Sequence, residues 1–330
     1  MTEVIKQVAI NQHYLPQLLL RGFCIPGSNQ VWVFRRNAAP FRTNVRNVGA
    51  ERFFYGCPSE QDLERALSDR EAKIGYVVSK VRTEELIAPG TEPILAELMA
   101  QLVARSKHTR LGFSEGSAFA LDLVRERLTD EDFLADEVLV SRVAESLREK
   151  GVTVPPAVLA NFVRKFRHAP GILSSVKAVF DAMDPYEMVK KAQTEFLERD
   201  LLTLGSRFAN LAWWLMSTDA SLVLGDVGPI AFSVEGDSAK PAVFYSPAED
   251  LLVLPISSSL ALVGGAAALS GREVMVSKMN RLSAELSVEF FVANQSQQEE
   301  LDFQADLGKR GDYWRRQFEK SVPRDWRGRS

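Results

Sequence analysis

A long central stretch of helical periodicity, flanked by two ends with strand-like patterns, is the feature that most constrains this fold. From Ser59 onward, apolar residues recur at intervals of three and four, beginning with Leu63, Leu67, Ile74, Val77, Val78 and Val81. Proline and glycine clusters divide the stretch, and the spacing predicts helices at about 91–108, 115–128, 130–150, 156–167, 171–182 and 185–217. Trp213 and Trp214 would lie in the core on the last of these helices. We therefore predict a helical block over residues 59–217.

The two ends of the chain carry short apolar or aromatic runs bounded by turn residues. Such runs are typical of strands, and we expect strands at 30–34, 53–55, 221–224, 230–233, 243–245, 251–254, 260–263 and 288–293. A short helix after Pro16 and another at about 272–286 complete the pattern. The layout predicts an α+β fold in which the N- and C-terminal segments share a mixed or antiparallel sheet beside the large central helical block.

The four segments that follow from this layout differ in charge. They are an N-terminal β-rich segment (1–58), the helical block (59–217), a C-terminal β-rich segment that completes the core (218–304) and a basic tail (305–330). The net charge is −3, yet residues 1–50 hold six Lys and Arg against the single acid Glu3, and the tail holds eight against four acids. If the ends meet in space, they form a positive surface suited to nucleic acid or another anionic ligand; the alternative is a solvated basic extension. The acidic helical block suits contact with a protein partner.

The composition predicts a cytoplasmic protein. Residues 1–10 mix Glu3, Lys6 and Gln7 among apolar residues, unlike a signal peptide. No apolar run approaches the roughly 20 residues of a membrane span, so no membrane contact is expected. Cys24 and Cys57 are too few for a disulfide framework and are expected to be reduced thiols.

The stretch from Asn11 to Phe23 holds the first candidate site residue, His13. It lies beside an amide pair and Pro16, in a segment whose one Lys or Arg residue is Arg21. Imidazole can exchange a proton near neutral pH, and guanidinium can bind phosphate or carboxylate through two hydrogen bonds. The segment therefore suits an anionic ligand, with His13 as general acid, general base or metal ligand and Arg21 as an anion clamp. The alternative is a histidine at a helix start whose ring bonds a neighbouring carbonyl.

A second group of candidates lies on the helix predicted at 91–108. Spacings of four and three would place Gln101, Arg105 and His108 on one helix face. Gln101 and Arg105 would then bind a phosphate or an acidic side chain. The alternative is that these residues form the exposed face of an amphipathic helix.

Asp226 is the candidate in the C-terminal segment. It stands between a predicted strand and Pro229, in a loop where polar residues often act. It can complete a His–Asp pair or bind a divalent metal through oxygen. Aspartate in a glycine-rich turn is also ordinary turn chemistry, so both interpretations stay open.

The order of these motifs resembles the bacterial family called domain of unknown function 4238. The resemblance rests on Gln12-His13-Tyr14-Leu15-Pro16 through Phe23, Val31-Trp32-Val33, Asn47-Val48 with Phe54-Tyr55, Gln101 with Arg105 and Arg110, Gly225-Asp226-Val227-Gly228-Pro229, and Leu254-Pro255-Ile256-Ser257. Where the family often has a Ser-Asp-x-Pro turn, Gly225 replaces the serine and an extra residue precedes Pro229. The resemblance implies a prokaryotic, intracellular protein and supplies no established reaction.

Two classes of function follow from these candidates. The first is a phosphodiester-directed hydrolase, a nuclease acting in bacterial conflict or defence. His13 would be its acid or base, Arg21 and Arg105 its anion clamps, and Asp226 a metal ligand or orienting carboxylate; the sequence does not fix the cofactor, for which Mg²⁺ and Mn²⁺ are candidates. The second is a non-catalytic ligand-sensing or protein-interaction module that uses the basic ends as its surface. The acidic net charge of −3 counts against tight nonspecific DNA binding.

Overall fold

The chain forms two compact units. The computed structural model describes residues 11–52, 54, 61–129, 137–149, 152–167, 178, 185–199, 201–235, 238–272 and 274–321. Unit 1 comprises Met1–Phe113 and Lys190–Gln317, and unit 2 comprises Ser114–Val189 and Phe318–Ser330. The four segments predicted from the sequence are a different division of the chain, and they remain a prediction.

Strands near the two ends of the chain flank a long run of helices, which is the layout of an α+β protein. The strands are β1 (Asn11–His13), β2 (Gln30–Arg35), β3 (Phe41–Asn44), β4 (Ala50–Arg52), β5 (Ala212–Ser217), β6 (Leu224–Gly225), β7 (Ile230–Ser233), β8 (Ala239–Pro241), β9 (Asp250–Pro255), β10 (Leu260–Gly265) and β11 (Phe290–Ala293). The α-helices are α1 (Gln17–Leu20), α2 (Gln61–Glu84), α3 (Glu92–Arg105), α4 (Lys107–Thr129), α5 (Glu137–Glu149), α6 (Pro156–Arg167), α8 (Pro185–Arg199), α9 (Leu201–Ala209), α10 (Val276–Leu286), α11 (Gln298–Asp306) and α12 (Tyr313–Ser321). Four 3₁₀ turns are described: η1 (Arg21–Phe23), η2 (Val45–Asn47), η4 (Ala242–Phe244) and η5 (Ala267–Leu269).

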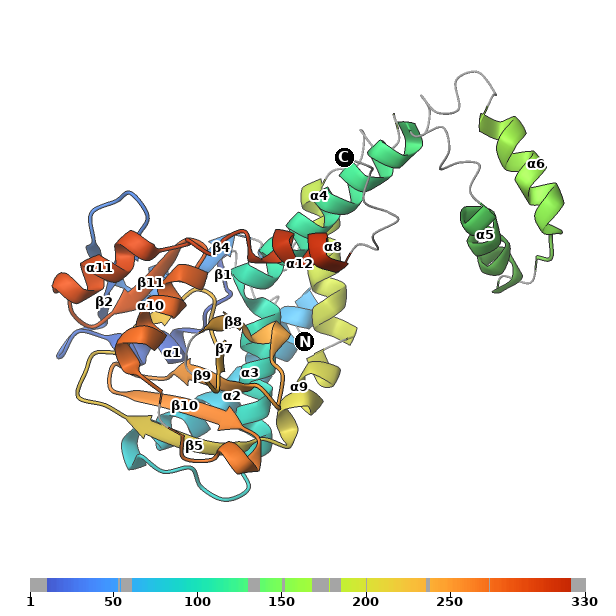
Figure 1. Cartoon of the computed structure of the whole chain (residues 1–330). Helices are drawn as coiled ribbons and strands as arrows, with labels where there is room; N and C mark the ends of the chain where they lie inside the picture. The colour runs from blue at the N-terminus through green and yellow to red at the C-terminus, as the bar shows by residue number, and fades with distance from the viewer. Residues whose placement is uncertain are drawn as a thin grey trace, which may run out of the picture. The chain divides into compact units, whose positions relative to one another are not determined.

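The two ends of the chain share a sheet, as the sequence predicts. Its order is β3-β2-β11-β6 and all of its pairs are antiparallel. Figure 1 shows β2, from the N-terminal segment, beside β11, from the C-terminal one. Phe34 and Phe291 are register partners in these two strands, and their rings stack at 4.7 Å between centroids. Apolar cross-strand pairs of this kind fix the register.

A five-stranded antiparallel sheet forms the rest of the β-structure in unit 1. Its order is β5-β10-β9-β7-β8, which leaves β5 and β8 at the edges. Every residue of β9 and β10 is buried, as expected of central strands covered on both faces. The same core takes in Leu19 of α1, Val78 of α2 and Leu98 of α3, so the helices that follow the N-terminal motif close over it.

The helix predicted over 185–217 is wrong in its last part. Helix α9 ends at Ala209, and Trp213 and Trp214 lie in β5. The partner strand explains the difference: Trp213 is opposite Gly264, where a Cβ atom would approach the indole ring to 2.6 Å. Two glycines on β10 thus leave room for large rings on the neighbouring strand, a long-range fit that local periodicity does not contain.

Smaller differences have similar causes. Residues 242–244 form the 3₁₀ turn η4 instead of part of a strand, and of the strand expected at 221–224 only Leu224 enters β6. The predicted helix at 171–182 and the strand positions 53 and 55 lie outside the described residues, apart from residue 178. Strands β1, β3, β4 and β8 and helices α11 and α12 are not among the predicted elements. Among the parts of the chain that the structure describes, no helix is both long and apolar enough to cross a membrane.

Unit 2 is helical where it is described. Helices α5 and α6 pack on each other through Val140, Ala144 and Leu159, which are buried. The later part of α4 belongs to this unit, whereas its first residues, Lys107 to Phe113, belong to unit 1. Those first residues of α4 lie next to the N-terminal motif.

Candidate functional site

The N-terminal motif lies on a short two-stranded ribbon. Strand β1 pairs antiparallel with β4, so that Gln12 is opposite Glu51 and His13 is opposite Ala50. Pro16 has extended backbone angles and caps α1. His13 is therefore a strand residue three positions before the helix cap, and the alternative of a histidine at the helix start is wrong.

Arg105 connects this ribbon to two helices. Its side chain is only 4% exposed at the end of α3. One guanidinium nitrogen donates to Glu71 Oε1 on α2, and the other donates to the carbonyl oxygen of His13. The predicted anion clamp thus binds an acidic side chain of its own chain, one of the two ligands that the sequence suggested. The alternative of an exposed helix face is wrong, because Gln101 and Arg105 are buried.

Gln101 lies one turn before Arg105 and is also buried. Its amide nitrogen donates to Glu97 Oε1 at 3.2 Å. The predicted shared helix face with His108 is wrong, because α3 ends at Arg105 and Ser106 has extended backbone angles. His108 belongs to α4, where it is buried and its Nδ1 accepts a hydrogen bond from Trp314 Nε1 at 2.8 Å.

His13 is half-buried beside these charges. Burial lowers the pKa of its imidazole; a hydrogen bond to the Arg46 backbone and the charge of Glu71 oppose this, and the charge of Arg105 lowers it further. The ring is therefore expected to be neutral at pH 7. A neutral imidazole can accept a proton, but its environment here also suits a purely structural role.

Asp226 is a fully enclosed carboxylate at the entrance to β11. Its Oδ1 accepts the amide of Val288 at 2.7 Å, and its Oδ2 accepts the amides of Glu289 at 2.7 Å and Phe290 at 3.2 Å. Burial raises the pKa of Asp226 to about 6, even though the three amides favour the charged form. The preceding Gly225 has no room for a side chain, since a Cβ would lie 2.2 Å from Ser287 Oγ. This packing accounts for the glycine at the position where serine was expected.

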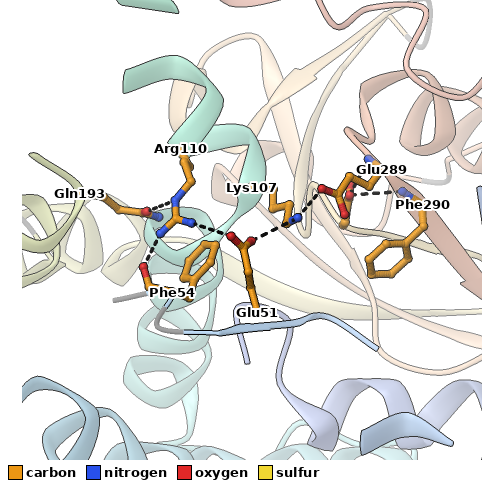
Figure 2. A network of polar contacts seen from close by, with 8 residues as sticks. Glu51, Phe54, Lys107, Arg110, Gln193, Glu289 and Phe290 are labelled. Atoms are coloured by element: carbon orange, nitrogen blue, oxygen red, sulfur yellow. Dashed lines mark hydrogen bonds and ion pairs between the residues drawn. The ribbon is translucent and has the colours of Figure 1, made fainter. Parts of the chain in front are cut away.

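A chain of alternating charges runs across the first turn of α4 (Figure 2). Arg110 pairs with Glu51 at 3.5 Å, Glu51 with Lys107 at 3.3 Å, and Lys107 with Glu289. Arg110 also donates to Gln193 Oε1 at 2.8 Å and to the carbonyl of Phe54. We call these four charged residues, Glu51, Lys107, Arg110 and Glu289, the α4 charge network.

The α4 charge network rests on aromatic rings of the N-terminal motif region. The Arg110 guanidinium lies 3.5 Å from the centroid of the Phe54 ring, and the Lys107 ammonium lies 5.1 Å from that of Tyr14. Sequence reasoning missed Lys107, Glu51 and Glu289, and only Arg110 was singled out. Their chain positions are separated by more than 50 residues on one side and 180 on the other, so no local spacing could have joined them.

Three exposed arginines of the β2–β3 hairpin and of the turn η2 that follows it contrast with these paired cations. Arg35, Arg42 and Arg46 are exposed, and among the described residues none of them has an acidic partner. Arg35 lies over the Phe41 ring at 5.8 Å and Arg42 over the Trp32 ring at 5.5 Å. We call Arg35, Arg42 and Arg46 the hairpin arginines.

The remaining candidate, Arg21, has different neighbours from Arg105. It is exposed at the start of η1, and its charge acts on Cys24 and Arg82. Arg82 itself donates to the carbonyls of Leu18, Leu19 and Ile256. In the described residues, no three His, Cys, Asp or Glu side chains are grouped as metal ligands would be.

Comparisons with known proteins bear on the whole of this arrangement. The protein-family model described as "Protein of unknown function (DUF4238)" matches residues 11–297. No curated protein and no solved structure matches the chain. The matched range includes the N-terminal motif and the Asp226 turn, and the match confirms the family.

Proposed function

For this chain, which belongs to the family described as "Protein of unknown function (DUF4238)", we propose a non-catalytic module that binds nucleic acid through the hairpin arginines. The observation that carries the proposal is the difference in pairing among the cations. Arg105, Lys107 and Arg110 each face a carboxylate of the chain. The hairpin arginines face solvent with no such partner in the described residues.

An unpaired guanidinium is available for phosphate at low cost. A phosphate approaching Arg105 would have to displace Glu71 from a nearly buried site, whereas one approaching Arg42 displaces only water and counterions. Residues 11–50 contain no acid at all, so the chain segment that carries the hairpin adds no repulsion of its own.

The rings beside the hairpin arginines add a second recognition element. Phe41 is 40% exposed on the edge strand β3, and Trp32 is half-buried beneath Arg42. Unstacked bases can stack on such rings and on guanidinium planes, typically with about 1–3 kcal/mol per base. This pairing of arginine and exposed ring favours a single strand over duplex DNA.

Affinity is expected to be modest because the protein is acidic overall. Three phosphate contacts on a single strand predict that log K falls with log salt at a slope of about −2. Binding should therefore be measured at low salt first, at roughly 0.05 M, and then at roughly 0.2 M, where the affinity should be about 16-fold lower.

The test is fluorescence anisotropy with a labelled oligothymidine of about twenty nucleotides. The variant Arg35→Gln/Arg42→Gln/Arg46→Gln should bind at least about 10-fold more weakly. A matched control, Arg148→Gln/Lys165→Gln/Lys191→Gln, removes the same charge from exposed positions elsewhere and should bind like the wild type. An equal loss of oligothymidine affinity in both variants would show that only net charge matters. If the wild type bound poly-glutamate as tightly as oligothymidine, nucleic acid would be excluded as the specific partner.

A phosphodiester-directed hydrolase remains the second candidate, and one observation favours it. Burial keeps the His13 imidazole neutral near pH 7, with Glu71 close enough to stabilise the cation that would form on proton transfer. Purified protein would be incubated with single- and double-stranded DNA and RNA and with Mg²⁺ or Mn²⁺, beside His13→Ala. Cleavage by the wild type alone supports the hydrolase. Equal cleavage by the wild type and by His13→Ala shows that His13 has no part in the reaction.

A further inference from the structure

Strand β5 is the outermost strand of the five-stranded sheet, and its outer edge has no partner strand among the described residues (Figure 1). Its other edge pairs with β10 along the whole length of the strand. The side chains of Trp213, Trp214, Leu215 and Met216 are apolar and only partly buried. A long apolar edge of this kind can take up a further strand.

The backbone groups on the outer edge of β5 follow from its pairing with β10. Directly after β5, the amide of Thr218 donates to the carbonyl of Ser259 at 2.9 Å. Hydrogen-bonded pairs alternate along an antiparallel ladder, so every second residue of β5 bonds to β10 and the residues between turn their N–H and C=O groups outward. These outward residues are Trp213, Leu215 and Ser217. Within the described part of the chain, their outward groups make no hydrogen bond.

The other edge strands of the two larger sheets have features that oppose strand addition. Strand β8 has only three residues and contains Lys240 and Pro241. Strand β3 contains Arg42 and follows Pro40, and β6 has only two residues. Short length, charge and proline are the usual means by which a protein keeps an edge from pairing. The six residues 212–217 have none of them, which favours an edge that pairs with another strand.

The two indole rings of β5 lie over β10. A Cβ atom on Gly264 would lie 2.6 Å from the Trp213 ring, and one on Gly265 would lie 3.2 Å from the Trp214 ring. The glycines thus give both rings room on the inner side of the strand. The large side chains of β5 itself therefore leave its outer edge open.

We propose that β5 pairs with β5 of a second copy of this chain, antiparallel and about a two-fold axis at Leu215. In this register Leu215 is opposite its own counterpart and Trp213 is opposite the partner's Ser217, so every outward N–H and C=O group is paired. Trp214 is then opposite the partner's Met216, and thioether sulfur and aromatic rings attract each other. The axis brings no charged residues of β5 together, and the net charge of −3 keeps repulsion between the copies small.

A second copy is the occupant that this edge fits because the same strand supplies both sides of the pairing. A two-fold axis closes after two copies, so the assembly ends at a dimer. The hairpin arginines belong to the other sheet and the turn that follows it. Dimer formation and nucleic-acid binding are therefore independent proposals.

The test is sedimentation velocity on the full chain over a range of concentrations. One strand pair buries less than the roughly 1,200 Å² of a standard interface, so we expect a monomer–dimer equilibrium with a dissociation constant of about 1–100 µM. Leu215→Lys should raise this constant at least about 10-fold, because two ammonium groups would meet at the axis. Leu301→Lys, at a 38% exposed leucine of α11, is the matched control and should dimerise as the wild type does.

A second variant removes an outward N–H group and adds no charge. Ser217 is exposed and its amide is not used by the chain, and edge strands accept proline at such a position. Ser217→Pro should therefore keep the wild-type circular dichroism spectrum and weaken the dimer at least about 10-fold.

Cross-linking tests the register, in a background without the two native cysteines (Cys24→Ser/Cys57→Ser). Leu215→Cys should form a disulfide-linked dimer on mild oxidation, since directly opposite Cα atoms lie about 5.5 Å apart, as a disulfide requires. Met216→Cys should cross-link far less, because that residue is opposite Trp214 and not its own counterpart.

Three results would each overturn the proposal. The first is a wild type that stays monomeric at about 100 µM, which would leave the β5 edge to a strand of another protein. The second is a dimer that is unaffected by both Leu215→Lys and Ser217→Pro. The third is cross-linking of Met216→Cys that equals or exceeds that of Leu215→Cys.

Discussion

Arginine plays opposite parts in two regions of unit 1. At the N-terminal motif, Arg105 is almost fully enclosed and is held by Glu71 and the His13 carbonyl. On the β2–β3 hairpin, Arg35 and Arg42 are exposed and lie over aromatic rings. The same side chain therefore supports the fold in one region and is available to a partner in the other. The difference lies in whether an acid of the chain faces it.

An arginine indicates a binding site only when no carboxylate of the chain already binds it. A cation enclosed with a carboxylate costs much to uncover, because breaking the pair leaves a charge in a poorly solvated place. An exposed cation next to a ring is weakly tied and keeps its capacity for phosphate. Arg105, the predicted anion clamp, is thus a stabilising residue of the fold, and the hairpin arginines, which no motif singled out, are the cations that we propose for phosphate binding.

The largest effect is expected from removing the enclosed arginine. Arg105→Met should lower the free energy of unfolding by about 3 kcal/mol, since Glu71 loses its cation and the His13 carbonyl loses its donor. Arg42→Met on the hairpin should change it by less than about 0.5 kcal/mol. Urea unfolding followed by circular dichroism measures both, and similar losses in the two variants would break the comparison.

Asp226 should change the free energy of unfolding by almost as much, but this change appears as a dependence on pH. Its folded pKa of about 6 lies above the ordinary aspartate pKa of 3.8, so between these pH values the folded state keeps a proton that the unfolded state has released. Stability from this group is therefore greatest at the acid end and falls by about 2–3 kcal/mol as pH rises through the window. Above pH 6 the loss is complete.

Urea unfolding at about pH 4.5 and about pH 7 checks this expectation. Asp226→Asn should lose the pH-dependent part, whereas the exposed Asp219→Asn should keep the wild-type difference. A wild-type protein whose stability instead rises across this range, with Asp226→Asn flat, would show that the three amide donors outweigh burial at Asp226.

The outer end of the α4 charge network should give the smallest effect. Glu289 is 45% exposed and Lys107 keeps Glu51 as a second partner, so Glu289→Gln should cost less than about 1 kcal/mol. The cost should shrink further in high salt. A loss of unfolding free energy as large as that of Arg105→Met would contradict this expectation. It would show that the half-exposed Lys107–Glu289 pair stabilises the fold as much as the enclosed Arg105–Glu71 pair does.

The sequence predicts the architecture better than the site because strand and helix patterns are local. The runs at 30–34 and 288–293 reveal β2 and β11, and the motif order reveals the family. The strand at Trp213 was missed because its stabilisation comes from Gly264 on another strand. The apolar periodicity also predicted one continuous helix over 91–108, whereas α3 ends at Arg105 because Ser106 has extended backbone angles.

The contacts of the candidate residues escape sequence analysis for the same physical reason. Arg105 finds Glu71, 34 positions earlier, and Asp226 finds three amides more than 60 positions later. Nothing in the spacing of either residue indicates whether its charge is occupied. Only the fold shows that an arginine is enclosed with an acid or that another is left to solvent.

The most direct test of the central claim is the salt dependence of oligothymidine binding in two single variants. The account predicts that Arg42→Gln reduces the slope of log K against log salt by about 0.7, the release of one phosphate contact. It predicts that Arg105→Gln, measured at a temperature where circular dichroism shows it folded, leaves the slope unchanged. A slope reduced by Arg105→Gln and not by Arg42→Gln would contradict it, because the enclosed arginine would then be the one that binds.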